Sequence, residues 1–164
     1  LHIPSHSFPT RRSSDLGDSN TIGKTKSAVY AFFVKKPKEH VDEILTAIHN
    51  IKTNQKDNYF PKVNTDCKEA FKENGCLYIG SVTSETLEER IKQHWREKNN
   101  DVSNKTYALK ICDWIIDAKI NKEDITVYYC DMTGQKGDII RIIEDCLATM
   151  YCPLLGKRGD SPKG

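Results

Sequence analysis

A buried strand, a glycine and an amphipathic helix follow one another in one short stretch, and this succession constrains the fold most strongly. Residues 76–82 are mostly apolar, β-branched or aromatic, which predicts a buried strand. Gly80 interrupts this run near its end. Leu87, Ile91 and Trp95 then recur at every fourth position, the spacing of one face of an α-helix. The chain must therefore pass from a buried strand into a helix that packs through one face.

The start of this helix carries a signal of its own. Thr86 is followed three residues later by Glu89, the spacing of a capping box, so we expect the helix to begin there. Arg90 and His94 are four residues apart and lie on one helix face. A strand that bears Tyr78 thus leads into a helix that bears an arginine and a histidine, and this arrangement favours phosphate binding.

These residues resemble the core of the GIY-YIG nuclease family. The tripeptide Tyr-Ile-Gly at residues 78–80 is followed by Arg90 and, one helical turn later, by His94. The resemblance covers about residues 28–158 and implies an α/β fold, with a small central three-stranded β-sheet flanked by helices. The number of predicted elements itself indicates helices around a mixed sheet.

The first motif of the family has a counterpart upstream. Residues 28–34 form a continuous apolar run, which predicts a central strand. Ala28-Val29-Tyr30 stands where Gly-Ile-Tyr is usual, so the tyrosine is kept and the glycine is not. An amphipathic pattern from about 38 to 52 predicts a helical insertion between the first two strands, followed by a loop with one helical turn at 54–73.

Three further elements are expected after the central helix. Residues 106–119 are predicted to form a second amphipathic helix, with a strand at their start as an alternative, 125–130 a third strand, and 138–151 the last helix, which ends before Pro153. The apolar stripe of the last helix is assigned to Ile139, Ile143, Cys146, Leu147 and Met150. Glu144 is expected at the margin of this stripe, partly desolvated but able to reach the site. Pro153 to Gly156 follow where the family has a proline-containing segment, although many members carry asparagine at the position of Gly156.

The resemblance implies a metal-dependent endonuclease that hydrolyses DNA phosphodiester bonds at a single site. Arg90 would hold phosphate oxygens, Tyr78 would orient or deprotonate the attacking water, and Glu144 would hold one Mg²⁺ or Mn²⁺ ion. The full set of implied catalytic residues is Tyr30, Tyr78, Arg90, His94 and Glu144. The expected substrate-binding residues are Gly80, Lys157 and Arg158.

Two other classes of function remain open. One is a catalytically inactive nucleic-acid-binding or interaction domain of the same fold, and the other is a small-molecule phosphate-binding domain that uses the helix N-terminus after Gly80. Taken singly, the tyrosines could be core aromatics, and Arg90 and His94 could lie on a solvated helix face. Cleavage specificity, biological role and oligomeric state are not indicated by the sequence.

Composition narrows the class of protein only broadly. The 164 residues are 37% hydrophobic, which fits one domain, expected at 24–164. The net charge of +2 does not by itself indicate nucleic acid binding. No apolar run reaches the roughly 20 residues needed to span a bilayer, so we expect no membrane partner. The six cysteines form no CxxC pair, and we expect reduced thiols in a cytoplasmic protein.

Residues 1–23 are predicted to be disordered, because they are polar, contain two prolines and show no periodicity. Residues 6–16 can be encoded by a nucleotide string that resembles a sequencing-library adapter. We therefore interpret residues 1–16 as an artefact of sequence assembly and exclude them from the fold.

Overall fold

The structure is a computed structural model, and it describes residues 11–12, 23–55, 60–96 and 107–156. The strands are β1 (Arg11–Arg12), β2 (Ala28–Val34), β3 (Cys76–Val82) and β4 (Ile125–Asp131). The helices are α2 (Pro37–Gln55), α3 (Lys68–Asn74), α4 (Leu87–Trp95), α5 (Ile111–Trp114) and α6 (Gly137–Tyr151), with short 3₁₀ turns η2 (Thr65–Cys67) and η3 (Lys122–Asp124).

The sheet has the strand order β1-β4-β2-β3, and the three long strands form the small central sheet that the sequence predicts. Every strand pairing is antiparallel, so the expectation of a mixed sheet is wrong. The connection from β2 to β3 explains the direction of β3. The connection leaves β2 at Val34 and comes back beside the same end of β2 just before β3 begins, where the N–H of Val34 donates to the carbonyl of Gly75 at 2.9 Å. The chain therefore re-enters the sheet in the reverse direction, as in a long hairpin.

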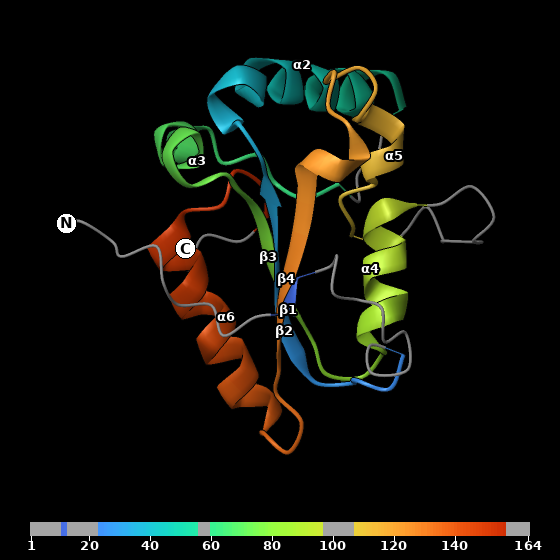
Figure 1. Cartoon of the computed structure of the whole chain (residues 1–164), viewed down its shortest axis with the longest axis vertical. Helices are drawn as coiled ribbons and strands as arrows, with labels where there is room; N and C mark the ends of the chain where they lie inside the picture. The colour runs from blue at the N-terminus through green and yellow to red at the C-terminus, as the bar shows by residue number, and fades with distance from the viewer. Residues whose placement is uncertain (1–10, 13–22, 56–59, 97–106, 157–164) are drawn as a thin grey trace.

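Helices cover both faces of the sheet. Figure 1 shows α6 on one side of the strands, α4 and α5 on the other, and α2 across the end of the sheet. Alternating side chains of β2 serve the two sides: Tyr30 and Phe32 join the larger core, whereas Val29 and Ala31 pack with Ile140 of α6. The site residues on β2 and α4 therefore belong to one face, and α6 belongs to the other.

The strands at 28–34 and 76–82 and the start of α4 are confirmed. Thr86 caps α4 with the reciprocal hydrogen bonds of a capping box with Glu89. The helix predicted at 106–119 is wrong at both ends, because α5 covers only Ile111–Trp114: it begins after Lys110, whose φ is +49°, and a turn follows it. Tertiary hydrogen bonds keep this segment extended: the N–H of Leu109 donates to His94, and its carbonyl accepts from Trp114.

The predicted buried stripe of α6 is wrong in part: Ile143 and Leu147 are half-buried and pack on the core, but Cys146 is exposed. Ile139 and Met150 are 43% and 56% exposed, whereas Ile140, Glu144 and Ala148 form the buried face. Glu144 thus lies in the middle of the face that contacts the sheet, rather than at its margin. The small Ala148 lets the helix approach the strands closely, and a hydrogen bond from the sheet satisfies the carboxylate.

The expectation of six reduced cysteines is wrong as well. Cys67 and Cys152 form a disulfide, with Cα atoms 5.3 Å apart and 85 positions between them in sequence. Only the fold brings the two residues together, so no local spacing could indicate the pair. The prediction of a cytoplasmic location rested on reduced cysteines and loses that support. The other four cysteines remain thiols.

Most of the segment predicted to be disordered lies outside the described residues. Arg11 and Arg12, however, pair with Tyr129 and Tyr128 of β4, so the expected disorder does not hold at these two positions. Among the described residues, no helix is both long and apolar enough to cross a membrane.

Candidate active site

Tyr30 lies at the centre of the candidate site, in the middle of β2. Its side chain is fully buried, and its hydroxyl oxygen lies 2.8 Å from Nε2 of His94 on α4. The other ring nitrogen of His94, Nδ1, accepts a hydrogen bond from the backbone N–H of Leu109 at 3.1 Å. Burial and then the charge of Arg90 hold the pKa of His94 well below its usual range, so the ring is neutral. A neutral imidazole that accepts at Nδ1 carries its proton on Nε2, and His94 therefore donates to Tyr30.

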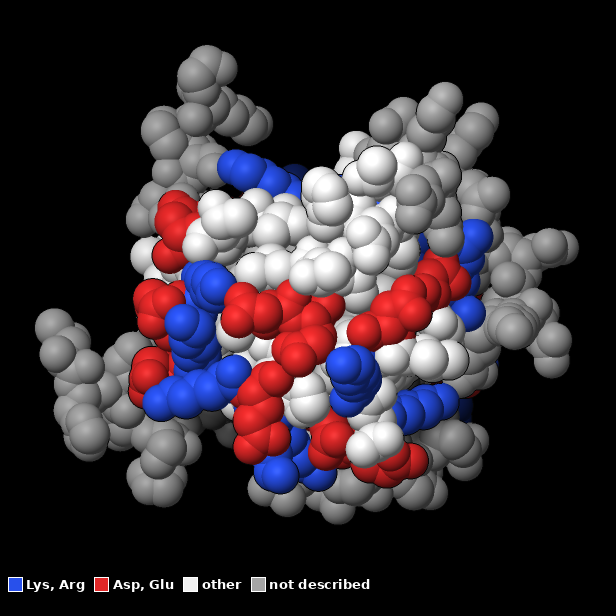
Figure 2. All heavy atoms as spheres, turned by 90° about the horizontal axis from the view of Figure 1, so that it is seen from above, with Lys and Arg blue, Asp and Glu red and all other residues white. Residues whose placement is uncertain are grey.

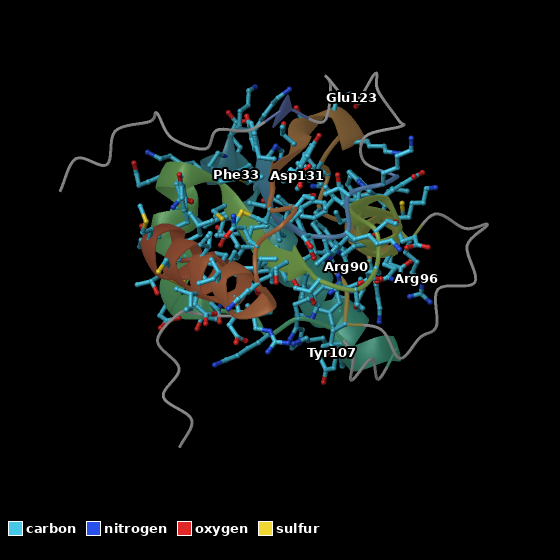
Figure 3. The ribbon with its side chains drawn as sticks, turned by 90° about the horizontal axis from the view of Figure 1, so that it is seen from below. Phe33, Arg90, Arg96, Tyr107, Glu123 and Asp131 are labelled. Atoms are coloured by element: carbon cyan, nitrogen blue, oxygen red, sulfur yellow. A yellow bond between two sulfur atoms is a disulfide. The ribbon has the colours of Figure 1, made fainter. Side chains whose placement is uncertain are left out.

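Arg90 holds the same hydroxyl from the preceding turn of α4. Its Nε donates to the oxygen of Tyr30 at 3.1 Å, and its terminal nitrogens donate to Oε1 of Gln93 at 2.7 Å and the backbone oxygen of Tyr107 at 2.8 Å. Figure 3 shows Arg90 and Tyr107 on the α4 side of the molecule. The side chain of Arg90 is 15% exposed, and its guanidinium carries more N–H groups than these bonds use. A fixed guanidinium can therefore still offer donors to a phosphate.

Tyr78 is the half-buried phenol of the site. The centre of its ring lies 4.8 Å from that of His94 and 6.3 Å from that of Tyr30. Burial raises the pKa of Tyr78, the charge of Arg90 lowers it, and the charge of Glu144 raises it; hydrogen bonds with Arg90 and Tyr30 lower it further. Burial raises the pKa of Tyr30 well above its ordinary value. Of these two phenols, Tyr78 is half-buried and Tyr30 is fully buried.

Two glycines make room for the tyrosines. A Cβ atom on Gly80 would lie 2.6 Å from the hydroxyl oxygen of Tyr30, and one on Gly156 would lie 2.7 Å from Cε2 of Tyr78. Gly156 has a φ of +94°, in the left-handed region that favours glycine. Gly80 was expected to contact substrate, but it is buried, and the structure gives it this steric role instead. The Tyr-Ile-Gly motif thus needs its glycine for close packing of the two phenols.

Glu144 reaches the site from the opposite face of the sheet. It accepts a short hydrogen bond from the hydroxyl of Ser81 on β3, which is the last strand of the sheet on that side. Its charge raises the pKa of both Tyr30 and Tyr78, although each phenol is affected more strongly by burial. The carboxylate and the two phenols therefore lie within electrostatic range of each other across strand β3.

Four of the five residues predicted to be catalytic, Tyr30, Tyr78, Arg90 and His94, are in contact on one face of the sheet, whereas Glu144 lies on the other face and bonds to Ser81. Tyr30 and His94 are fully buried, so they contact Tyr78 and Arg90 rather than a substrate. This differs from the expectation that they support the water and the phosphate directly. Lys157 and Arg158, predicted to bind substrate, lie outside the described residues.

Sequence reasoning missed two side chains that support the site, Ser81 and Asn64. Ser81 is the one hydroxyl in an otherwise apolar strand apart from Tyr78, and this polarity was a usable signal. Asn64 lies in the connection between β2 and β3, and its amide donates to the carbonyls of Pro153 and Gly156 at 3.0 and 3.1 Å. Asn64 and the segment that it binds are far apart in sequence, so no local pattern indicates this contact.

The residues present are compatible with one divalent cation. Across the described ranges, no three His, Cys, Asp or Glu side chains cluster as a metal cage. A single carboxylate still suits Mg²⁺, which usually keeps several waters and takes substrate phosphate as a ligand. Glu144 is the carboxylate that would hold such an ion; it is 7% exposed, and Ser81 orients one of its oxygens.

Comparisons with protein-family models, with curated proteins and with solved structures find no match to this chain.

Proposed function

We propose that this chain is a metal-dependent endonuclease of the GIY-YIG type, which hydrolyses DNA phosphodiester bonds with Tyr78 as its reactive group. The observation that carries the proposal is the set of polar side chains around Tyr78. Arg90, Tyr30 and His94 approach it from one face of the sheet, and Glu144 influences it from the other. If Tyr78 were only a core aromatic, its packing would not require an arginine, a neutral histidine and a carboxylate near its half-buried phenol.

In the proposed mechanism, Tyr78 acts as a phenolate: its oxygen takes a proton from the attacking water and becomes the neutral phenol. An unperturbed phenol has a pKa near ~10, and burial raises that of Tyr78. The opposing influences come from Arg90 and from the hydrogen bond with Tyr30, which favour the phenolate. A Mg²⁺ ion held by Glu144 would supply charge neutralisation at the phosphate and favour ionisation nearby. The remaining N–H groups of Arg90 would face the phosphate oxygens.

Tyr30 and His94 act as positioning residues. His94 donates to the oxygen of Tyr30, as does Arg90, so the lone pairs of that oxygen are engaged. The hydroxyl hydrogen of Tyr30 is then directed to another acceptor, and the oxygen of Tyr78 is its hydrogen-bond partner. This chain of bonds would stabilise a developing negative charge on Tyr78.

The charges on the α2 side favour approach of DNA from elsewhere. Figure 2 shows acidic side chains across this face with basic ones between and beside them. The segment from Lys36 through α2, together with α3, carries the ion pairs Lys36–Glu39, Lys38–Glu73, Lys68–Asp42 and Lys72–Glu69. A face of mixed, paired charge has no continuous positive potential, so we expect DNA to contact the edge of β3 and α4 instead.

A nicking assay with supercoiled plasmid tests the proposal. Wild-type protein should convert plasmid to the open circle with Mg²⁺ or Mn²⁺ and should not do so with a chelator. Tyr78→Phe keeps the ring and removes the hydroxyl, and should lower the rate at least ~10²-fold. Tyr128→Phe is the matched control, since Tyr128 is a half-buried tyrosine of β4 whose ring packs on Phe33 away from the site. Equal rates for Tyr78→Phe and wild type would refute the proposed role.

One alternative is favoured by a specific observation. Three N–H groups of Arg90 are already bound by protein oxygens, and both burial and Glu144 raise the pKa of Tyr78. These features fit a catalytically inactive nucleic-acid-binding domain of the same fold. Wild-type protein that binds DNA in a mobility-shift assay but never nicks it, with either metal, would favour this alternative.

A further inference from the structure

The ring of Tyr78 rests against a backbone segment that the proposed mechanism does not use. This segment, residues 153–156, is called the Tyr78 wall below. Gly156 lies so close to the ring that a Cβ there would be 2.7 Å from Cε2 of Tyr78. The N–H groups of Leu154 and Leu155 donate to the carbonyls of Cys76 and Leu77, at 3.1 and 2.9 Å, so hydrogen bonds join the wall to β3.

The connection between β2 and β3 holds the wall in place from its outer side. The N–H of Gly156 donates to the carbonyl of Lys62, and the N–H of Asn64 donates to that of Leu154, both at 2.8 Å. The side-chain amide of Asn64 adds hydrogen bonds to Pro153 and Gly156. Asn64 is 2% exposed, and within the described part of the chain its Oδ1 has no hydrogen-bond partner, so burying this residue against the wall has a cost in free energy.

The Cys67–Cys152 disulfide joins these two segments covalently. Cys152 directly precedes the wall, and Cys67 lies three residues after Asn64, with its N–H bonded to the carbonyl of Asn64 at 3.0 Å. The bond therefore ties the segment that holds the wall to the wall itself. Besides the disulfide, hydrogen bonds and the burial of Leu154 and Leu155 in the core keep Gly156 against Tyr78.

We propose that the Cys67–Cys152 disulfide controls the candidate site, which is ordered when the bond is formed and loosened when a dithiol reduces it. In the reduction, the S–S bond breaks and takes up two electrons and two protons to give two thiols, while the dithiol becomes a disulfide. The effect on activity rests on the proposed nuclease function; the effect on the wall does not. Freed from its covalent tie, the wall would let the ring of Tyr78 shift relative to Tyr30 and Arg90, and small displacements of catalytic groups slow reactions strongly.

The test begins by establishing the redox state. Under denaturing conditions, a maleimide should label four cysteines before treatment with dithiothreitol and six after it. Labelling of all six without reductant would overturn the proposal.

Two readouts are then compared in the oxidised and reduced protein, at a temperature where circular dichroism shows both to be folded. Hydrogen exchange of the backbone amides of residues 154–156 should be faster after reduction. The rate of plasmid nicking at saturating DNA should fall about tenfold to a hundredfold, with DNA affinity little changed, and reoxidation should restore it. If neither form nicks DNA, the proposed function fails, and hydrogen exchange alone decides the inference. Unchanged exchange, or equal nicking by both forms, would overturn it.

Variants separate this disulfide from the other thiols. The double variant Cys67→Ser/Cys152→Ser should behave like the reduced protein and show no response to dithiothreitol. Cys146→Ser is the matched control, since Cys146 is an exposed thiol of α6, and it should respond like wild type. If the double variant does not fold, the comparison of oxidised and reduced wild type stands by itself.

Discussion

His94 shows how burial decides what a titratable side chain can do. An exposed histidine gains a proton near neutral pH, whereas His94 is fully buried beside the positive charge of Arg90, and its pKa is held well below the usual range. It therefore serves as a neutral donor to Tyr30 and is not the general acid or phosphate ligand that an Arg–His pair on a helix face would indicate.

The buried, neutral state of His94 makes stability depend on pH. The unfolded chain binds a proton on this residue below about pH 6.5, whereas the folded protein does so only at much lower pH. The contribution of His94 to stability is therefore complete above about pH 6.5 and is lost as the pH falls toward the folded-state pKa, by up to ~1.4 kcal/mol per pH unit. Denaturant unfolding at pH 7.5 and 5.5 should show a larger loss for wild type than for His94→Gln. The exposed His49 offers a control, since His49→Gln should lose as much as wild type; an equal loss in His94→Gln would contradict the account.

Gly80 gives a second test at this scale. A Cβ at this position would meet the hydroxyl oxygen of Tyr30, which two hydrogen bonds hold in place. Gly80→Ala should therefore lower the free energy of unfolding by about 1–3 kcal/mol, and should reduce nicking by displacing the phenols. Gly137→Ala is a suitable control, because the nearest atom there, Cγ2 of Thr83, lies at 3.9 Å. Equal unfolding curves for the two variants would show that Tyr30 yields easily and that the packing argument is wrong.

At the scale of elements, patterns within a few neighbouring residues predicted the strands and helix starts that depend on those residues alone. The apolar runs of β2 and β3 and the Thr86–Glu89 capping box predicted the strands and the start of α4, because each signal lies within a few neighbouring residues. The prediction of a helix at 106–119 was wrong at its start, because the backbone N–H of Leu109 donates to His94, which belongs to another element. The prediction of the buried face of α6 was wrong in part, because a hydrogen bond from Ser81 offsets the cost of burying the Glu144 carboxylate against the sheet. Periodicity ranks side chains by polarity, and it cannot account for a distant partner.

The orientation of α6 is testable by contrasting its two faces. Ile142 is 57% exposed, so Ile142→Gln should change the free energy of unfolding by no more than about 0.5 kcal/mol. Ala148 is 2% exposed, so Ala148→Leu should destabilise by about 1–3 kcal/mol through overpacking. The stripe expected from periodicity places Ala148 on the solvent side, and it predicts that Ala148→Leu is harmless. Thermal or denaturant unfolding distinguishes the two.

At the scale of the molecule, the candidate site is assembled from parts that are far apart in sequence. Tyr30 and Arg90 come from one face of the sheet, Glu144 comes from the other, and the wall behind Tyr78 is held by Asn64. The choice of residues could be predicted from the motif resemblance and their spacing. The sequence could not predict that Tyr78 is half-buried while Tyr30 and His94 are fully buried, because this depends on which faces of α4 and α6 are covered. The same holds for the disulfide, whose cysteines meet only in the folded chain.

The central claim, that groups from both faces of the sheet form one catalytic site around Tyr78, is tested most directly by the nicking rate of Glu144→Gln. Glutamine has nearly the same shape, can still accept the hydrogen bond from Ser81, and lacks the charge that a metal ion requires. Asp145→Asn makes the same chemical change one residue away. The account predicts at least a ~10²-fold loss of metal-dependent nicking for Glu144→Gln, with DNA affinity near that of wild type and normal nicking by Asp145→Asn. A folded Glu144→Gln variant that nicks plasmid as fast as wild type would contradict it.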